Sequence, residues 1–131
     1  MTNSKQINLL QIVLGIVQLL LILLFTWAGV MKLLFPGELP WLWAKENPDL
    51  VAVTGVVDLV AGLSLLLPLL PRVSSKLTLY AAYGISILML AAGLFHILRG
   101  ESDQIGFNLF VLVCALFLAW GKRKELPQIK K

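Results

Sequence analysis

Four polar residues interrupt long apolar segments of this chain, each in a different segment: Lys32, Asp58, His96 and Asn108. An aspartate at the centre of a membrane helix costs about 2.5 to 3.5 kcal/mol, so such residues are usually buried, paired and functional. Together these side chains can donate and accept hydrogen bonds, and the histidine and the aspartate can also exchange protons. If the fold brings them together, we expect a polar site able to hold the headgroup of a quinone or another lipid-like ligand.

The elements that must position these residues are four apolar segments, at about 9–34, 50–70, 77–98 and 105–120. Each is long enough, or nearly long enough, to cross a hydrocarbon core of roughly 30 Å at about 1.5 Å per residue. Of the 131 residues, 59% are hydrophobic and 14% are charged, whereas a soluble domain has about 25% charged residues. We therefore expect an all-α polytopic membrane protein, with residues 1–131 forming one antiparallel four-helix transmembrane bundle.

The charged residues predict how this bundle lies in the membrane. With four spans, one side carries Lys5, Arg72, Lys76, Lys122, Arg123, Lys124, Lys130 and Lys131. The other side carries Lys32, Lys45 and Arg99 against Glu38, Glu46, Asp49, Glu101 and Asp103. The positive-inside rule then places both termini in the cytoplasm. Because the net charge of +4 follows this topology, we do not expect nucleic-acid binding.

The four polar residues are also expected at a similar depth. Asp58 lies eight residues into its segment, roughly 12 Å at the rise of a helix. Lys32, His96 and Asn108 each lie about one turn from the outer end of theirs. Gly55 and Gly62 share a helix face with Asp58, and small residues let membrane helices approach closely. The polar side chains are therefore expected on packing faces in the outer half of the membrane.

Two arrangements of the acid and the base fit this pattern. Asp58 and Lys32 can form an ion pair across two helices, although desolvation offsets much of its attraction. Alternatively, Lys32 extends to the headgroups while Asp58 is neutral or bonded to another neighbour. His96, near a helix end, fits an interfacial or hydrogen-bonded histidine as well as a ligand-binding one.

The remaining features give structural expectations. Trp41 and Trp43 lie in a proline-rich loop, where an aromatic anchor at the membrane surface is favoured over a lid on a ligand site. Pro68 should kink or end the second helix. Gln18 should bond another helix. The single cysteine, Cys114, fits a small apolar filler.

No known catalytic motif occurs in the sequence, so no catalytic residue is assigned and enzymatic activity stays open. One histidine, one aspartate and one asparagine form a poor metal site, and the cysteine lies in another part of the fourth segment. We expect neither a metal ion nor an intrinsic cofactor.

The ordered polar pattern resembles the DoxX-like membrane proteins. It includes WAGVMKLL at 27–34, GVVDLVAGLSLLLP at 55–68, MLAAGLFH at 89–96, Asn108 and AWGK at 119–122. The resemblance covers nearly the whole chain and implies a compact four-helix bundle. Relatives commonly have glutamate where this chain has Asp58, and the shorter side chain has less reach toward Lys32.

The family's name derives from a subunit associated with thiosulfate:quinone oxidoreduction, and other members are linked to oxidative-stress complexes or to membrane-protein assembly. The resemblance therefore implies an accessory subunit that binds a quinone or lipid-like ligand through Lys32, Asp58, His96 and Asn108. A membrane or soluble oxidoreductase is the expected partner besides the lipid bilayer. The alternative is a non-enzymatic assembly or interaction partner whose polar cluster is structural, and a homo-oligomer also stays open.

Overall fold

In the computed structural model, the backbone is described for residues 2–101 and 105–129, and the side chains for 9–101 and 105–124. Four long helices dominate the fold: α1 (Thr2–Leu34), α3 (Pro48–Leu66), α4 (Lys76–Leu98) and α5 (Ile105–Ile129). Shorter helical segments are η1 (Pro36–Glu38), α2 (Leu42–Glu46) and η2 (Leu67–Leu69). The predicted all-α architecture of four antiparallel helices is confirmed.

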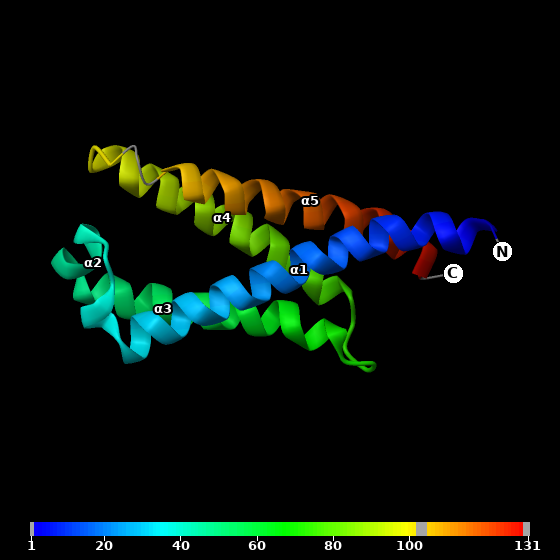
Figure 1. Ribbon diagram of the computed structural model, residues 1–131, viewed down its shortest axis with the longest axis horizontal. Coiled ribbons are helices and arrows are strands. Elements are labelled where there is room, and N and C mark those ends of the chain that lie inside the picture. The colour runs from blue at the N-terminus through cyan, green and yellow to red at the C-terminus, as the bar shows by residue number, and fades with distance from the viewer. Residues whose placement is uncertain (1, 102–104, 130–131) are drawn as a thin grey trace.

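The long helices form two pairs, α1 with α3 and α4 with α5 (Figure 1). The pairs lie close together where α1 begins and α5 ends, and they diverge toward the opposite end, which carries α2 (Figure 1). We call this opposite end, formed by η1, α2 and residues 99–101, the α2 end.

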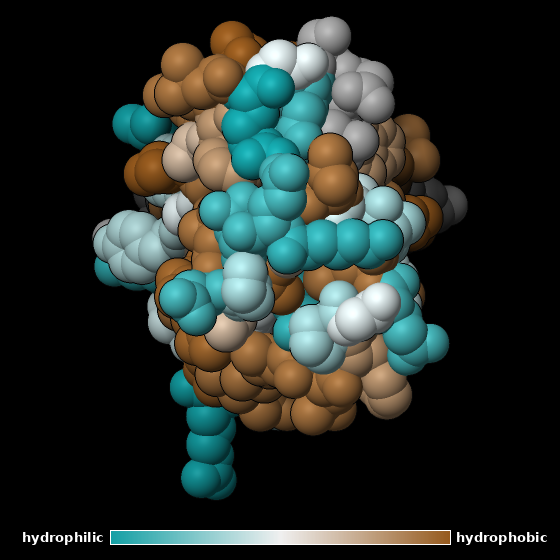
Figure 2. All heavy atoms as spheres, turned by 90° about the vertical axis from the view of Figure 1, so that its left-hand side faces the viewer, coloured by the Kyte–Doolittle hydropathy of each residue, from teal (hydrophilic) through white to brown (hydrophobic). Residues whose placement is uncertain are grey.

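Each long helix is apolar enough to cross a membrane, over Leu9–Leu34, Pro48–Leu69, Lys76–Leu98 and Ile105–Lys124. Large apolar side chains are exposed along the outside of these helices, whereas several polar side chains are buried inside. This distribution suits a bundle surrounded by lipid. Hydrophilic residues cross the middle of the α2 end and hydrophobic residues surround them (Figure 2), as expected where a bundle meets headgroups and water.

The core of the bundle joins all four long helices through fully buried side chains such as Leu21, Leu65, Ile85 and Leu118. Gln18 lies in this core, and its Nε2 donates a 2.7 Å hydrogen bond to the carbonyl oxygen of Leu65. The prediction that Gln18 bonds another helix is therefore confirmed. The bond satisfies a carbonyl in the last turn of α3, where the helix no longer supplies regular donors.

Prolines set two of the helix ends, and the end at Pro68 is the one that the sequence analysis predicts. Pro36 follows α1, and the residue before a proline is disfavoured in helical conformation. Pro68 lacks a backbone N–H, and α3 gives way to the 3-10 segment η2 around it.

Other helix boundaries differ from the predicted ones. α1 begins at Thr2, so the polar residues before the first apolar segment are already helical, and α5 continues to Ile129 instead of ending near residue 120. Leaving the hydrocarbon does not by itself end a helix, because lysine, arginine and glutamate are good helix formers. Of the charged residues used for the topology, Lys5, Asp103, Lys130 and Lys131 lie outside those whose side chains are described.

Candidate functional site

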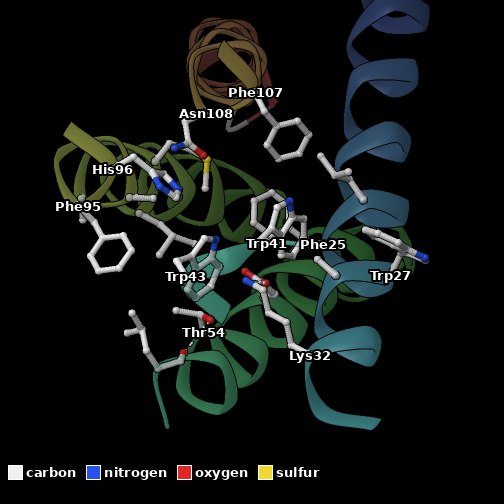
Figure 3. A pocket seen from close by; sticks show the side chains of 18 residues that line it. Phe25, Trp27, Lys32, Trp41, Trp43, Thr54, Phe95, His96, Phe107 and Asn108 are labelled. Carbon is white, nitrogen blue, oxygen red and sulfur yellow. Dashed lines mark hydrogen bonds and ion pairs between the residues drawn. The ribbon is translucent and has the colours of Figure 1, made fainter. Parts of the chain in front are cut away.

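A pocket of about 650 Å³ lies between the two helix pairs toward the α2 end. Its lining includes all four polar residues that the sequence singles out, namely Lys32, Asp58, His96 and Asn108. Aromatic side chains form much of the remaining wall: Phe25, Trp27, Trp41, Trp43, Phe95 and Phe107. In Figure 3, His96 and Asn108 project from α4 and α5 on one side of the pocket, and Lys32 projects from α1 on the other. The fold thus brings one polar residue from each long helix to one cavity.

Lys32 and Asp58 form a direct ion pair between α1 and α3. Lys32 Nζ lies 2.8 Å from Asp58 Oδ2, and the two side chains are 11% and 5% exposed. Of the two arrangements that the sequence left open, the structure therefore contains the ion pair. Lys32 Nζ also lies 5.6 Å from the centre of the Trp43 ring, a distance at which a cation is attracted to the aromatic face.

Close approach of α1 and α3 explains how the shorter aspartate reaches the lysine. A Cβ atom added to Gly29 would lie 2.6 Å from Leu59 Cγ and 2.9 Å from the Gly55 carbonyl oxygen. A Cβ added to Gly55 would lie 3.0 Å from Lys32 Cβ. Glycine at both positions therefore lets the two backbones come together, and Asp58 needs no additional methylene to meet Lys32.

His96 belongs to a second polar network, at the α2 end. Its Nδ1 lies 2.9 Å from Oε1 of Glu101, and Arg99 Nε donates a 3.0 Å hydrogen bond to the same oxygen. Arg99 Nη2 also donates a hydrogen bond to Glu46, the last residue of α2. This network ties α2 to the end of α4, and it places a carboxylate behind the His96 ring.

Local helix-capping geometry positions Glu101. Gly100 has φ of 74°, the left-handed conformation that commonly ends helices. The backbone N–H of Gly100 donates to the Ile97 carbonyl, and that of Glu101 donates to the His96 carbonyl at 2.8 Å. These two bonds form a Schellman motif, which turns the chain back over the last turn of α4. The turn brings the Glu101 side chain beside the His96 ring.

The charges in this network alter acid–base behaviour outside the membrane spans. Hydrogen bonds from Arg99 and then from His96 hold the pKa of Glu101 below its ordinary value. Hydrogen bonds to Glu101 and then to Glu46 raise the pKa of Arg99. Glu101 therefore keeps its negative charge at neutral pH and accepts hydrogen bonds without donating one.

Asn108 differs from the other polar lining residues because its amide lacks a partner. Its Nδ2 is buried and has no hydrogen-bond partner among the residues that the structure describes. Buried donors are satisfied in most native proteins, and leaving one unpaired costs about 1–3 kcal/mol. An unpaired amide on the wall of a cavity is therefore suited to hydrogen-bond a molecule inside it.

The two loop tryptophans lie on the pocket wall. Trp41 and Trp43 stack with ring centres 6.1 Å apart, and Trp43 meets the His96 ring edge-to-face at 6.3 Å. The sequence favoured a surface anchor for this pair over a contribution to a ligand site. The structure places both side chains on the cavity wall, with α2 packed on α3 and Trp43 against Phe95 and His96 of α4.

Sequence reasoning missed the contributions of Glu101 and Arg99 to the surroundings of His96. The signal that could have found Glu101 is local: Gly100 follows the last residues of a helix, and the residue after such a glycine folds back over the histidine. Within the described parts of the chain, no group of three or more histidine, cysteine, aspartate or glutamate residues is placed to hold a metal ion.

The sequence comparisons identify the family. Comparison with curated proteins and with solved structures gave no match. A model of the DoxX-like family does match residues 16–118, an interval that contains every residue lining the pocket and the network around His96. The match covers well over half of a chain that has four apolar helices of membrane-spanning length. This multi-pass membrane protein therefore belongs to the DoxX-like family.

Proposed function

We propose that the protein binds a quinone-type lipid in this pocket and acts as an accessory subunit of a redox system. The unpaired Asn108 amide is the observation that carries the proposal, because it offers a buried hydrogen-bond donor to an enclosed ligand. A quinone carbonyl is an acceptor that suits this donor. Lys32, Asp58 and His96 complete the polar part of the proposed site, with Asp58 orienting Lys32 and His96 contacting the headgroup.

The pocket wall supports a ring-shaped headgroup with an apolar tail. Aromatic side chains such as Trp41, Trp43 and Phe107 offer faces and edges against which a flat ring can pack. Leu24, Leu88 and Met89 provide apolar surface for the tail. A cavity of about 650 Å³ falls within the usual range of roughly 300–1,000 Å³ for small-molecule sites.

The charge balance favours a neutral headgroup over a phosphate. Lys32 is the cation in the lining, and Asp58 already matches its charge. Arg99 at the α2 end is likewise shared between two carboxylates, Glu46 and Glu101. An incoming phosphate would have to displace a carboxylate from one of these cations, whereas a quinone adds no charge.

Ligand analysis of purified protein tests the binding. We expect mass spectrometry of protein extracted in mild detergent to find about one quinone per chain, and Asn108→Leu and His96→Ala to lose most of it. Ser86→Ala is the matched control, since Ser86 is buried on α4 and bonds the Ala82 carbonyl without lining the pocket. If only bulk phospholipid copurifies, or if Asn108→Leu retains the quinone, the proposed site is wrong.

The accessory role adds an oxidoreductase as partner, in the membrane or bound to its surface. Quinone reduction requires electrons from a donor, and such an enzyme would supply them. Chemical cross-linking in native membranes followed by mass spectrometry should recover one oxidoreductase with the protein. Recovery of no such enzyme would limit the function to ligand binding.

A second candidate is a membrane-protein assembly or interaction partner whose polar residues are structural. The observation that favours it is the mutual pairing of Lys32 with Asp58 and of Arg99 with Glu46, which joins helices without a ligand. In this case Asp58→Asn lowers thermal stability, no quinone copurifies with the wild type, and partner binding at permissive temperature is unchanged.

We also propose that the protein lies in a bacterial inner membrane with both termini in the cytoplasm. The turn between α3 and α4, which contains Arg72, and the last turns of α5, which contain Lys122, lie at the end of the bundle away from α2 (Figure 1), as the positive-inside rule requires for this orientation. A reporter enzyme fused to the C-terminus should be active in the cytoplasm, and periplasmic activity would reverse the assignment.

A further inference from the structure

The contact between Glu101 and His96 determines which hydrogen-bonding edge the histidine can present to a ligand. Glu101 Oε1 lies 2.9 Å from Nδ1 of His96 and also accepts a hydrogen bond from Arg99 Nε. The His96 and Glu101 side chains are 8% and 18% exposed, so water does not readily replace this contact. The backbone bond from Glu101 N–H to the His96 carbonyl holds the carboxylate in place.

An ionised carboxylate can only accept hydrogen bonds, so Nδ1 of His96 must carry the hydrogen in this contact. In a neutral imidazole, the other nitrogen, Nε2, then has a free lone pair and is an acceptor. The inference is made for the neutral imidazole, the form in which Nε2 has this lone pair. Nε2 has no hydrogen-bond partner among the described residues, and His96 lines the pocket.

The lining therefore presents two complementary groups to a ligand. Asn108 Nδ2 is an unpaired donor, and His96 Nε2 is an unpaired acceptor. A hydroxyl group can accept one hydrogen bond and donate another, whereas a quinone carbonyl can only accept. A carbonyl placed against Nε2 would bring two lone pairs together and leave both without a hydrogen.

We propose that the pocket prefers the reduced, hydroxyl-bearing quinol to the oxidised quinone, and that Glu101 sets this preference by fixing the tautomer of His96. The inference rests on the proposed quinone-type ligand and adds its redox form. Glu101 is a positioning residue in this arrangement, because it acts on the ligand only through the His96 ring. Its place outside the apolar segments and after a helix-ending glycine keeps it clear of the bound molecule.

Binding measurements on the full chain in lipid nanodiscs test the preference. The probes are decylubiquinol under argon, decylubiquinone, and the dimethyl ether of the quinol, which lacks both hydroxyl hydrogens. Empty nanodiscs correct for partition into lipid, and bound ligand is quantified by chromatography. The quinol hydroxyl makes one more hydrogen bond, to His96 Nε2, so we expect the quinol to bind about tenfold more tightly than the quinone. The ether cannot donate this bond, so it should bind as weakly as the quinone.

Without Glu101, either nitrogen of the His96 ring can carry the hydrogen, so Nε2 no longer has to be an acceptor. Glu101→Ala should therefore reduce the preference for the quinol to less than about twofold, because the preference depends on this one hydrogen bond. Glu46→Ala is the matched control: it removes the other carboxylate on Arg99 without touching His96, and the preference should persist. A quinol preference that survives Glu101→Ala overturns the inference.

A spectroscopic measurement reads the tautomer directly. The chain contains one histidine, so a sample labelled with ¹⁵N-histidine gives a single pair of ring-nitrogen signals. We expect a protonated Nδ1 and an unprotonated Nε2 in the wild type, and loss of this pattern in Glu101→Ala.

The outcomes separate the two proposals. Equal binding of quinol and quinone, or a protonated Nε2, overturns the quinol preference and leaves the quinone site standing. Absence of saturable binding by either probe overturns the proposed function itself, whatever tautomer the spectrum reports.

Discussion

Glu101 Oε1 and His96 Nδ1 lie 2.9 Å apart, although His96 is in an apolar segment and Glu101 lies in the turn that follows it. Glu101 lies five positions after His96, and a regular helix would carry it beyond the end of α4. The left-handed Gly100 instead turns the chain so that Glu101 returns over the turn that contains His96. A single backbone conformation thus couples the end of a helix to the chemistry of a side chain in the pocket.

Replacing Gly100 should disturb this contact. Gly100→Ala forces a side chain into the left-handed region and should destabilise the protein by about 1–2 kcal/mol. We also expect the ring-nitrogen signals of His96 to change, because Glu101 is held by the same turn. Thermal unfolding in detergent and ¹⁵N-histidine spectra measure the two effects, and Gly106→Ala in α5, where an added Cβ meets no atom within 4 Å, is the control. An unchanged spectrum in Gly100→Ala would show that the turn does not hold Glu101.

Acidification should remove the stabilisation that Glu101 provides. Its pKa in the folded protein is lower than the ordinary value of 4.5, mainly through the hydrogen bonds from Arg99 and His96. The contribution is therefore complete above about pH 4.5 and is lost as the pH falls toward the folded-state pKa. The difference in unfolding temperature between wild type and Glu101→Gln should stay constant from about pH 7 to 5 and shrink below that. A difference that persists unchanged to about pH 3 would contradict this account.

The sequence predicts that Lys32, Asp58, His96 and Asn108 lie toward the same end of the bundle, because polar residues are easily recognised within apolar helices. It does not predict the Lys32–Asp58 contact, since that depends on how closely two backbones approach. It does not predict the role of Glu101 either, because the residue lies in a polar turn where acids are ordinary. The sequence favours a membrane-surface anchor for Trp41 and Trp43 because tryptophan is enriched there, and it does not predict that both side chains line the cavity.

Substitutions of Lys32 and Asp58 should have strongly non-additive effects on stability. Breaking a buried pair in a soluble protein costs about 3–5 kcal/mol, whereas polar contacts between membrane helices average about 0.6 kcal/mol. Because Lys32 retains some exposure, we expect Asp58→Asn to cost about 1–3 kcal/mol, between these limits. Lys32→Met combined with Asp58→Leu should recover most of the loss, because no uncompensated charge remains. Unfolding of Lys32→Met, of Asp58→Leu and of the double variant measures the coupling energy, and losses that simply add would contradict it.

The Lys32–Asp58 ion pair should also depend on the close packing of α1 on α3 at Gly29. The Cβ of Gly29→Ala would meet Leu59 at 2.6 Å and the Gly55 carbonyl at 2.9 Å, and a carbonyl in a helix cannot move aside without moving its backbone. We expect a loss of about 1–3 kcal/mol from overpacking. Gly84→Ala on α4 is the matched control, since its Cβ meets no atom within 4 Å and alanine is the better helix former.

Gly29→Ala should also reduce the coupling energy between Lys32 and Asp58, because it pushes α1 and α3 apart and the short aspartate side chain then no longer reaches the lysine. Asp58→Glu, with one more methylene, should then restore part of the coupling in the Gly29→Ala background and gain little in the wild type. If Gly29→Ala leaves the coupling unchanged, helix spacing does not determine the contact, and the flexible Lys32 side chain must absorb the difference.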